Sequence, residues 1–537
     1  MTNCAAISSS ICRRDLLKAG LVCSLGAGLA SVLPAAVAPE AACASEAGTF
    51  TMAINFMPSS LQPSSGGNDD QTMVVRPIYE CLFQELAGTG IEYHLVDGVQ
   101  ISEDGLTYTL HVRDNATWSD GEPVTVDDIL FSIDYSGRNY EGKTSTTYIN
   151  QQPVTFNQLD DKTLEIVLPE PYVTYIYTLN NITPLPAHVF DNDYTKVDDQ
   201  AATYFFTPGM VTSGAYTVEQ INEDSIVYAA RPDYYLGEVP VKTLVAKTIG
   251  SGSTRQLAFE NGEIDYMRVT TAEDLAKYQG DADAYNVYSF SEARLNYLQV
   301  STAGSVISTL GDDARKAIFL ALNGQEIVDF AYGTDELATP ANSLLTPDQE
   351  DYNPDCAGYA QDLETAKQLA EASGLAGQTL TYIYNADRPN MEQVAVVIQQ
   401  ELQAIGVNLN IEALDSTTFF ATFFKDDQAN TWDLGTNGWD SERGQSARQC
   451  IYYLRGAFMS TGFSQEVADL AVQANGTADA VERKQLWADI QDKALAEFWE
   501  YPLTYTSYVM VSHKNVTGLD CSPIVPEFSR FDGIEVA

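Results

Sequence analysis

The sequence predicts an α/β fold built from more than one domain. At 537 residues, with 45% apolar and 10% aromatic residues, the chain is too long for one ordinary domain and can fill two or three hydrophobic cores. Runs that alternate apolar and polar residues are typical of half-buried strands, whereas helical apolar spacing appears mainly later in the chain. A strand, a helix and a second strand follow one another over residues 380–414, which favours an α/β sheet with a ligand crevice at its strand ends.

The first 44 residues are predicted to be an export signal rather than part of the fold. Arg13 and Arg14 precede an apolar run over residues 19–33, which is too short to span a bilayer and is followed by small residues. The arginine pair, the leucines after it and Lys18 resemble a twin-arginine export signal, although Cys12 stands where that signal prefers Ser or Thr. The alternative is a plain secretory signal whose arginines supply only charge, and the glycine-rich apolar run favours the twin-arginine interpretation.

Two processing sites compete at the end of this signal. Ala42-Cys43-Ala44 fits a small-x-small peptidase site, which would make Ser45 the first mature residue. Cys43 also fits the acylated position of a lipoprotein, although Glu40 stands where an apolar residue is normal. We favour cleavage after Ala44, and lipidation of Cys43 stays open.

Charge and cysteine content exclude several classes of function. The net charge is −45, from 29 Lys and Arg against 74 Asp and Glu, which opposes binding to nucleic acid or to anionic lipid. Four cysteines remain after removal of the signal, and three disulfide pairings are possible among them: Cys81, Cys356, Cys450 and Cys521. No CxxC spacing occurs, so thiol-based metal binding is not expected.

Individual strands and helices follow from local periodicity. Alternating runs bounded by turn residues predict strands at 105–112, 162–168, 214–220 and 224–230. Apolar residues at i, i+3 and i+4 predict helices at 363–373 and 391–406, the second ending at Gly406. Strands at 380–385 and 407–414 flank this second helix and complete the strand–helix–strand unit.

The segment DNATWSDGEP, residues 114–123, raises the question of catalysis. Trp118 lies among the carboxylates of Asp114, Asp120 and Glu122, as in a sugar-cleaving site where one acid protonates and another attacks or activates water. Turn chemistry also explains these residues, because Asp120-Gly121 favours a turn and Pro123 fixes the backbone. We interpret the carboxylates as scaffold, because the sequence places no second acid at the separation that catalysis requires and catalytic motifs are missing elsewhere.

The residues after this turn predict the start of a helix near Val126. Thr125 is suited to cap it, and Asp127 and Asp128 lie where carboxylates favour the positive end of the helix dipole.

Motifs of common enzyme classes are missing from the sequence. HExxH, GxSxG, GxxxxGK[ST] and GxGxxG do not occur, so zinc protease, serine hydrolase, P-loop and dinucleotide-binding functions lack their motifs. The four histidines are scattered and predict no ligand cluster: His94, His111, His188 and His513. We expect neither catalytic activity nor a cofactor or bound metal.

The order of several motifs resembles one known family. SEDGLTYTLHVRDNATWSDGEPVTVDDILFSID is similar to the signature segment of the family 5 extracellular solute-binding proteins, the dipeptide, oligopeptide and nickel receptors of ABC importers. Further matches follow in family order over nearly the whole mature chain: TSGAYTVEQ, ARPDYYLGEVP, LAFENGEIDYM, LNYLQVST, DDARKAIFLALNGQEIVDFAYG, PANSLL and ELQAIGVNLNIE. One departure is ALNGQEI, which stands where the family usually has an Asp-Arg pair.

The resemblance implies a two-lobed fold of the periplasmic-binding-protein type II kind, with an extra inserted domain in the first lobe. It assigns the core of lobe 1 to residues 45–76, 205–298 and 507–537, the inserted domain to 77–204 and lobe 2 to 299–506. The chain would cross between lobes at LNYLQVST and YPLTYTSYVMV, and the lobes would close on a solute by hinge motion.

The same resemblance implies an exported receptor that captures a peptide-like solute and delivers it to ABC permease subunits in the membrane. We expect it to act in the periplasm or at the outer face of the cell membrane, as a monomer. Two alternatives stay open: the same fold binding a metal chelate or sugar, or an exported enzyme with a cofactor, which a twin-arginine signal would suit.

The stretch GTNGWDSER, residues 435–443, is the predicted recognition site. Carried over from peptide-binding relatives, Gly438, Trp439 and Asp440 would lie along the ligand backbone. Glu442 would hold its amino group, although the family has aspartate there, and Asp440 is a possible substitute. Arg443, Gly444 and Gln445, which follow Glu442, also differ from the Tyr-Pro-Asp type of sequence that is common at this point in the family. The facing lobe would contribute three residues of the SSGGNDD loop, which are Gly67, Asn68 and Asp69.

Overall fold

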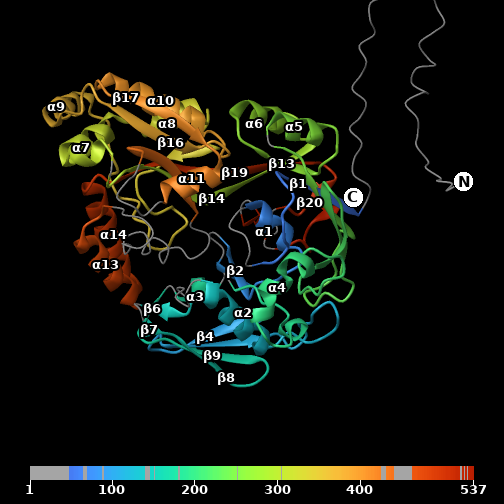
Figure 1. Ribbon diagram of the computed structural model, residues 1–537. Coiled ribbons are helices and arrows are strands. Elements are labelled where there is room, and N and C mark those ends of the chain that lie inside the picture. Colours follow the sequence, from blue (N-terminus) through green and yellow to red (C-terminus); the bar gives the residue numbers. More distant parts are fainter. Residues whose placement is uncertain are drawn as a thin grey trace, which may run out of the picture. The chain divides into compact units, whose positions relative to one another are not determined.

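The computed structural model (Figure 1) describes the chain from Gly48 onward, with gaps. The described residues are 48–63, 69–86, 90–139, 146–149, 152–173, 175–179, 182–250, 252–303, 305–424, 431–440, 462–519, 523–524, 527–528 and 530–537. All of them belong to a single compact unit, residues 43–537.

A four-stranded sheet in the described residues has the order β1-β12-β11-β10. Its strands are β1 (Thr49–Ile54), β10 (Tyr216–Ile221), β11 (Ser225–Ala230) and β12 (Thr243–Thr248). β1 runs parallel to β12, and the other neighbours are antiparallel. The strands predicted at 214–220 and 224–230 are therefore confirmed as β10 and β11.

A second four-stranded sheet is antiparallel throughout and has the order β4-β5-β9-β8. It contains β4 (Val96–Ile101), β5 (Thr107–Val112), β8 (Thr155–Gln158) and β9 (Thr163–Val167). Every second residue of β5 is buried, as a strand with one face in a core requires. This confirms the strands predicted at 105–112 and 162–168.

Shorter elements accompany these sheets. The helices are α1 (Asp69–Val75), α2 (Val126–Asn139), α3 (Tyr175–Thr178), α4 (Thr195–Tyr204) and the 3-10 turn η2 (Ala187–Phe190). Two-stranded pairs are β2 (Phe83–Leu86) with β3 (Gly90–Tyr93), β6 (Tyr148–Ile149) with β7 (Gln152–Pro153), β20 (Val516–Thr517) with β23 (Glu535–Val536), and β21 (Pro523–Ile524) with β22 (Glu527–Phe528). Helix α2 begins at Val126, as predicted.

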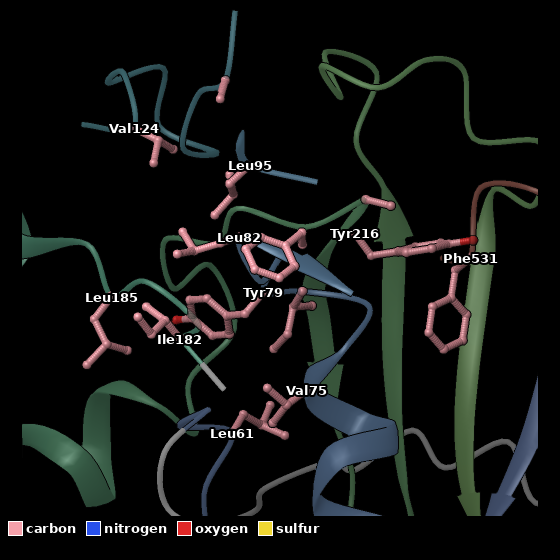
Figure 2. Packing of buried hydrophobic residues seen from close by; sticks show 14 of the residues in the cluster. Leu61, Val75, Tyr79, Leu82, Leu95, Val124, Ile182, Leu185, Tyr216 and Phe531 are labelled. Carbon is pink, nitrogen blue, oxygen red and sulfur yellow. The ribbon is translucent and has the colours of Figure 1, made fainter. Parts of the chain in front are cut away.

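One hydrophobic cluster, the first core, joins these elements (Figure 2). Leu61, Val75 and Tyr79 come from the start of the described chain, and Tyr216 comes from β10. Phe531, near the C-terminus, packs against Tyr216 with ring centroids 6.4 Å apart. Because a fully buried side chain of this size contributes about 1.5–3 kcal/mol, the C-terminal tail helps to stabilise a core formed mainly by the first half of the chain.

A seven-stranded sheet contains most strands of the second half. Its order is β13-β19-β14-β18-β16-β17, with β15 beside β19. The strands are β13 (Tyr266–Val269), β14 (Tyr285–Val300), β15 (Ala338–Pro340), β16 (Thr379–Asn385), β17 (Asn408–Leu414), β18 (Leu434–Asp440) and β19 (Glu500–His513). β16 and β17 are parallel and are joined by α10 (Met391–Ala404), so the predicted strand–helix–strand unit is confirmed.

The long strands β14 and β19 pair in antiparallel fashion from Tyr285↔His513 to Gln299↔Glu500. The two predicted crossings lie along this pair. Tyr508 and Met510 of β19 pack in the first core. Their neighbours Val509 and Val511 point to the opposite face and belong to a different cluster, the second core.

Helices cover both faces of the large sheet (Figure 1). The second core includes residues of α5 (Ser253–Glu260), α6 (Ala272–Gln279), α7 (Asp312–Ala321), α8 (Gly324–Ala331), α9 (Leu363–Ser373) and α10, with η3 (Ile307–Thr309). The third core includes residues of α11 (Ser416–Phe423), α13 (Gln465–Gly476) and α14 (Ala480–Ala496).

Strand β14 contributes alternately to these two cores. Leu298 and Val300 lie in the second core, whereas Leu295 and Tyr297 lie in the third.

The helix predicted at 363–373 is confirmed as α9. In the described part of the chain, no helix combines the length and apolarity that a bilayer crossing needs.

Candidate functional site

Strand β18 carries the predicted recognition residues and has a partly open edge. Along one edge it pairs with β14 over its whole length, from Val300↔Leu434 to Arg294↔Asp440. Along the other edge it pairs with β16 only from Leu434 to Thr436. No described strand pairs with that second edge at residues 437–440.

Gly438 lies under two polar side chains of the neighbouring strand. A Cβ atom at this position would lie 2.6 Å from Asn296 Oδ1 and closer still to the Arg294 guanidinium. Real Cβ atoms do not approach other atoms so closely, so any larger residue at this position would displace the side chains of Arg294 and Asn296 from the strand. The sequence prediction included Gly438 but missed both partners, because polar residues occur throughout β14 and do not single them out.

A buried polar cluster continues from these side chains onto β19. Asn296 Nδ2 donates to Thr504 Oγ1 at 3.1 Å and to the Tyr332 hydroxyl at 3.4 Å. Asn296, Arg294 and Thr504 are all buried. Burial raises the pKa of Tyr332, so its neutral phenol accepts this bond at ordinary pH.

An ion pair borders the same cluster. Arg268 Nη2 lies 2.9 Å from the buried Glu292 Oε2, and the Arg268 guanidinium lies 4.5 Å from the ring centroid of Tyr508. Burial disfavours the charged guanidinium, but the charge and hydrogen bond of Glu292 together with Tyr508 outweigh it and raise the pKa of Arg268. Both charges are therefore fixed next to the strand that carries Gly438.

The other predicted site residues are only partly described. Trp439 and Asp440 end β18, and only their backbone is described; Asp69 is the first residue of α1, in the segment that packs in the first core. Gly67, Asn68 and Glu442 lie outside the described residues, as do Arg13, Arg14 and Cys43 of the predicted signal.

The turn at 114–123 has the bonding of a scaffold. Trp118 is fully buried and its backbone N–H donates to Glu122 O at 2.8 Å, while Glu122 N donates to Asp120 Oδ1 at 3.2 Å. Asp120 also pairs with His188 at 2.9 Å. Asp114 is 88% exposed. These carboxylates are thus occupied by turn contacts or face water.

Asp128 lies in the first turn of α2, as predicted, and it has a further structural role that the sequence did not show. Its side chain is buried and links three segments. Asp128 Oδ2 accepts from Thr125 N at 2.9 Å and from Trp118 Nε1 at 3.2 Å, and Oδ1 accepts from Ala187 N at 2.9 Å. Burial raises its pKa, and these three donors oppose that effect.

Arg231 secures the same turn from the other side. Its side chain is 2% exposed and donates to the carbonyl oxygens of Thr117, Trp118, Thr212 and Gly214 at 3.2–3.4 Å. It also pairs with Asp233 at 3.1 Å. Only a guanidinium presents this many donors in a fixed plane, so the ARPDYYLGEVP and WSDGEP motifs are joined by this residue.

The histidines do not converge. His111 pairs with Asp97 at 3.1 Å, and His513 Nε2 contacts Phe259 O at 2.8 Å. The fully buried His94 lies 2.5 Å from Glu80; burial opposes its charge, but Cys81 and Glu80 raise its pKa to about 10. Among the described residues, no group of three or more His, Cys, Asp or Glu is placed to hold a metal.

The cysteines give a partial answer on disulfides. Cys81 and Cys356 are both buried free thiols, so they do not pair with each other. Burial raises the pKa of Cys356. Cys450 and Cys521 lie outside the described residues.

Comparison with known proteins places this geometry in context. The protein-family model for bacterial extracellular solute-binding proteins, family 5 Middle, matches residues 90–457 of this chain. The probable D,D-dipeptide-binding periplasmic protein DdpA of Escherichia coli (strain K12) is 22% identical over 492 residues, which cover 88% of this chain and 91% of that protein. The dipeptide-binding protein of the same organism is 24% identical and covers 89% and 92%.

Solved structures are similar over nearly the whole chain. The substrate-binding protein CtaP of Listeria monocytogenes aligns with a TM-score of 0.80 at 24% identity, covering 92% of this chain and all of that one. DppA of Helicobacter pylori, solved with the peptide STSA, aligns with a TM-score of 0.75 at 22% identity, covering 91% and 97%. These likenesses confirm the predicted α/β fold of the two-lobed binding-protein class.

Proposed function

Because the chain belongs to the bacterial extracellular solute-binding proteins of family 5, we propose that it captures a peptide-like solute and delivers it to the membrane permease of an ABC importer. The observation that carries this proposal is the open edge of β18 at residues 437–440. Relatives named as dipeptide-binding proteins, and the DppA structure with its bound peptide, support the same solute class.

The open edge suits the backbone of a short extended peptide. An extended peptide can add to a free strand edge through main-chain hydrogen bonds, which recognise the backbone and ignore the side chains. Four residues at about 3.4 Å each give an edge of about 14 Å, and alternate residues direct their N–H and C=O groups outward. Two residues of the solute can pair there, so we propose a solute of about two to four residues.

Carboxylates near the end of β18 would select the amino terminus of that peptide. Asp440 is the last described residue of the strand, and Glu442 follows two positions later. Gly67, Asn68 and Asp69 would face them from the first lobe. A buried carboxylate paired with an ammonium group is costly to break, at about 3–5 kcal/mol, so such a pair would discriminate strongly against blocked peptides.

Capture would proceed by closure of two lobes without turnover of the solute. We propose the lobe boundaries predicted from the sequence, with an inserted domain at 77–204 and with β14 and β19 as the crossing strands. The solute drives closure only to the extent that it binds the closed form more tightly than the open form. Its binding also protects the monomer against heat in proportion to RT ln(1 + [L]/Kd).

Calorimetry with a library of di- to pentapeptides tests this function. We expect Glu442→Gln or Asp440→Asn to weaken binding by two decades or more, and amino-terminal acetylation of the peptide to do the same. Asp283→Asn, an exposed acid on another segment, is the matched control. If both site variants and acetylated peptides bind as before, the amino-group site is wrong.

Native mass spectrometry of the purified protein tests the alternatives. A co-purifying peptide supports the proposal, whereas a metal chelate or a sugar would assign the same receptor fold to another solute. A stoichiometric chromophore in the absorption spectrum would contradict a receptor function and favour an exported enzyme.

Export through the twin-arginine route is part of the proposal. Arg13 and Arg14 are read as a pair by a receptor in that route, whereas a general signal needs only positive charge. Replacing both with lysine should therefore leave full-length precursor in the cytoplasm, and unimpaired export would refute the route. Labelling with a radioactive fatty acid, with Cys43→Ser as the control, tests whether the mature protein is lipid-anchored.

A further inference from the structure

A backbone hydrogen bond joins two distant parts of the chain. Val173 N donates to Asn475 O at 3.0 Å. Val173 lies in the loop between β9 and α3, and Asn475 lies in the last turn of α13. The two residues are about 300 positions apart, so this contact exists only because the fold brings these segments together.

The bond connects residues that belong to different hydrophobic cores. Tyr172 and Tyr175, on either side of Val173, pack against the first core. Ala471 and Ala474, in the same helix as Asn475, are members of the third core. The contact therefore links segments of two different hydrophobic cores by a polar bond.

The side chain of Asn475 is also unusual. It is 2% exposed, and neither Nδ2 nor Oδ1 has a hydrogen-bond partner among the described residues. A buried amide without partners is destabilised, because water would bond it if the segments separated. The contact is thus poorly suited to a permanent interface and well suited to one that opens.

From these observations we propose that the loop 170–173 and the last turn of α13 form a reversible latch. The latch engages when the protein closes on its solute and disengages on release. This inference rests on the proposed function, because it assigns the contact to the closed form of a solute-binding cycle. The unsatisfied amide of Asn475 disfavours closure without solute, so the empty protein stays receptive.

A reversible cross-link tests the latch directly. An N–H to O=C bond brings the two Cα atoms to within about 6 Å, which is within the usual span of a disulfide. Val173→Cys with Asn475→Cys should therefore form a disulfide under mild oxidation, and each single cysteine variant is the control. Native Cys81 and Cys356 are buried, which limits competing reactions.

Two measurements test the latch and the proposed solute class separately. Without added solute, the oxidised double variant should have a smaller radius of gyration by X-ray scattering than the same protein after reduction. With an equimolar mixture of di- and tripeptides, disulfide formation in a glutathione buffer should be at least fivefold faster than without it. If peptides have no effect but oxidation still compacts the protein, the solute class is wrong and the latch stands.

A single substitution supplies an independent measurement. Asn475→Leu replaces the unsatisfied amide with an apolar side chain of the same branched shape and should favour the closed form, which shifts the scattering of the solute-free protein toward that of the oxidised double variant. The latch is refuted if no disulfide forms, or if the oxidised and reduced proteins scatter identically.

Discussion

A buried carboxylate on α10 makes the stability of this protein sensitive to pH. Glu401 is 7% exposed, and its Oε1 accepts from Asn323 N at 3.0 Å. Its Oε2 has no hydrogen-bond partner among the described residues. The Asp-Arg pair usual in the family is Asn323-Gly324 here, so this position supplies no cation. Burial raises the pKa of Glu401 from 4.5 to about 8, aided by the charge of Glu326 and opposed by the Asn323 bond.

The sign of the effect follows from proton binding. Between pH 4.5 and about 8 the folded state holds the proton on Glu401 and the unfolded state does not, so stability falls as pH rises through this window. The two pKa values differ by about 3.5 units, and at about 1.36 kcal/mol per unit the full effect has a ceiling of about 5 kcal/mol. Relaxation and water entry reduce such effects, so we expect a loss of about 1–3 kcal/mol.

Glu401→Gln should remove the part of this pH dependence that Glu401 contributes. The amide keeps an acceptor for Asn323 N and carries no charge, so the variant should be more stable than the wild type at pH 8.5 and similar to it at pH 4.5. Urea unfolding of the mature protein at half-unit pH steps measures this, with the exposed Glu364→Gln on α9 as the matched control. Parallel stability curves for wild type and Glu401→Gln from pH 5 to 8.5 would refute the reasoning.

Three further changes have defined outcomes. Glu500→Gln should reduce the fall in the free energy of unfolding over the same pH range, because burial raises the pKa of Glu500 to about 8. Arg231→Lys should lower the free energy of unfolding by about 2–4 kcal/mol, since an ammonium cannot bond four carbonyls in one plane; an unchanged denaturation midpoint would contradict this. Gly438→Ala should weaken solute binding at least tenfold in calorimetry, whereas Gly98→Ala on β4, where a Cβ meets nothing, should bind normally.

Local features of the sequence predicted the elements well. Alternation placed β5, β9, β10 and β11, and apolar spacing placed α9 and α10, because each pattern depends on residues close together in the chain. The strand–helix–strand unit followed from the same signals. The resemblance located β18, since its motif is contiguous.

Long-range bonding could not be predicted in this way. Asp128 sits in the first turn of its helix, which suggests a surface acid, but the fold brings Trp118 and Ala187 onto it. Arg231 binds carbonyls more than 100 residues away, and carbonyl groups carry no sequence signature. Glu401 has the pattern of an exposed helical acid, and only the packing of Asn323 against it reveals its burial.

The open edge of β18 depends on where its neighbour β16 stops. Asn385 ends β16; it is 1% exposed, and its Oδ1 accepts from Asp387 N at 3.0 Å and from Ser416 Oγ at 3.2 Å. A buried side chain that bonds the next turn directs the chain away from the sheet, as Asn does in turns. β18 therefore extends beyond Thr436 without a partner on that side among the strands that the structure describes, while β14 supports its other edge to Asp440. The edge of β18 that we propose for recognition thus begins where Asn385 ends β16, and Gly438 leaves room there for the side chains of β14.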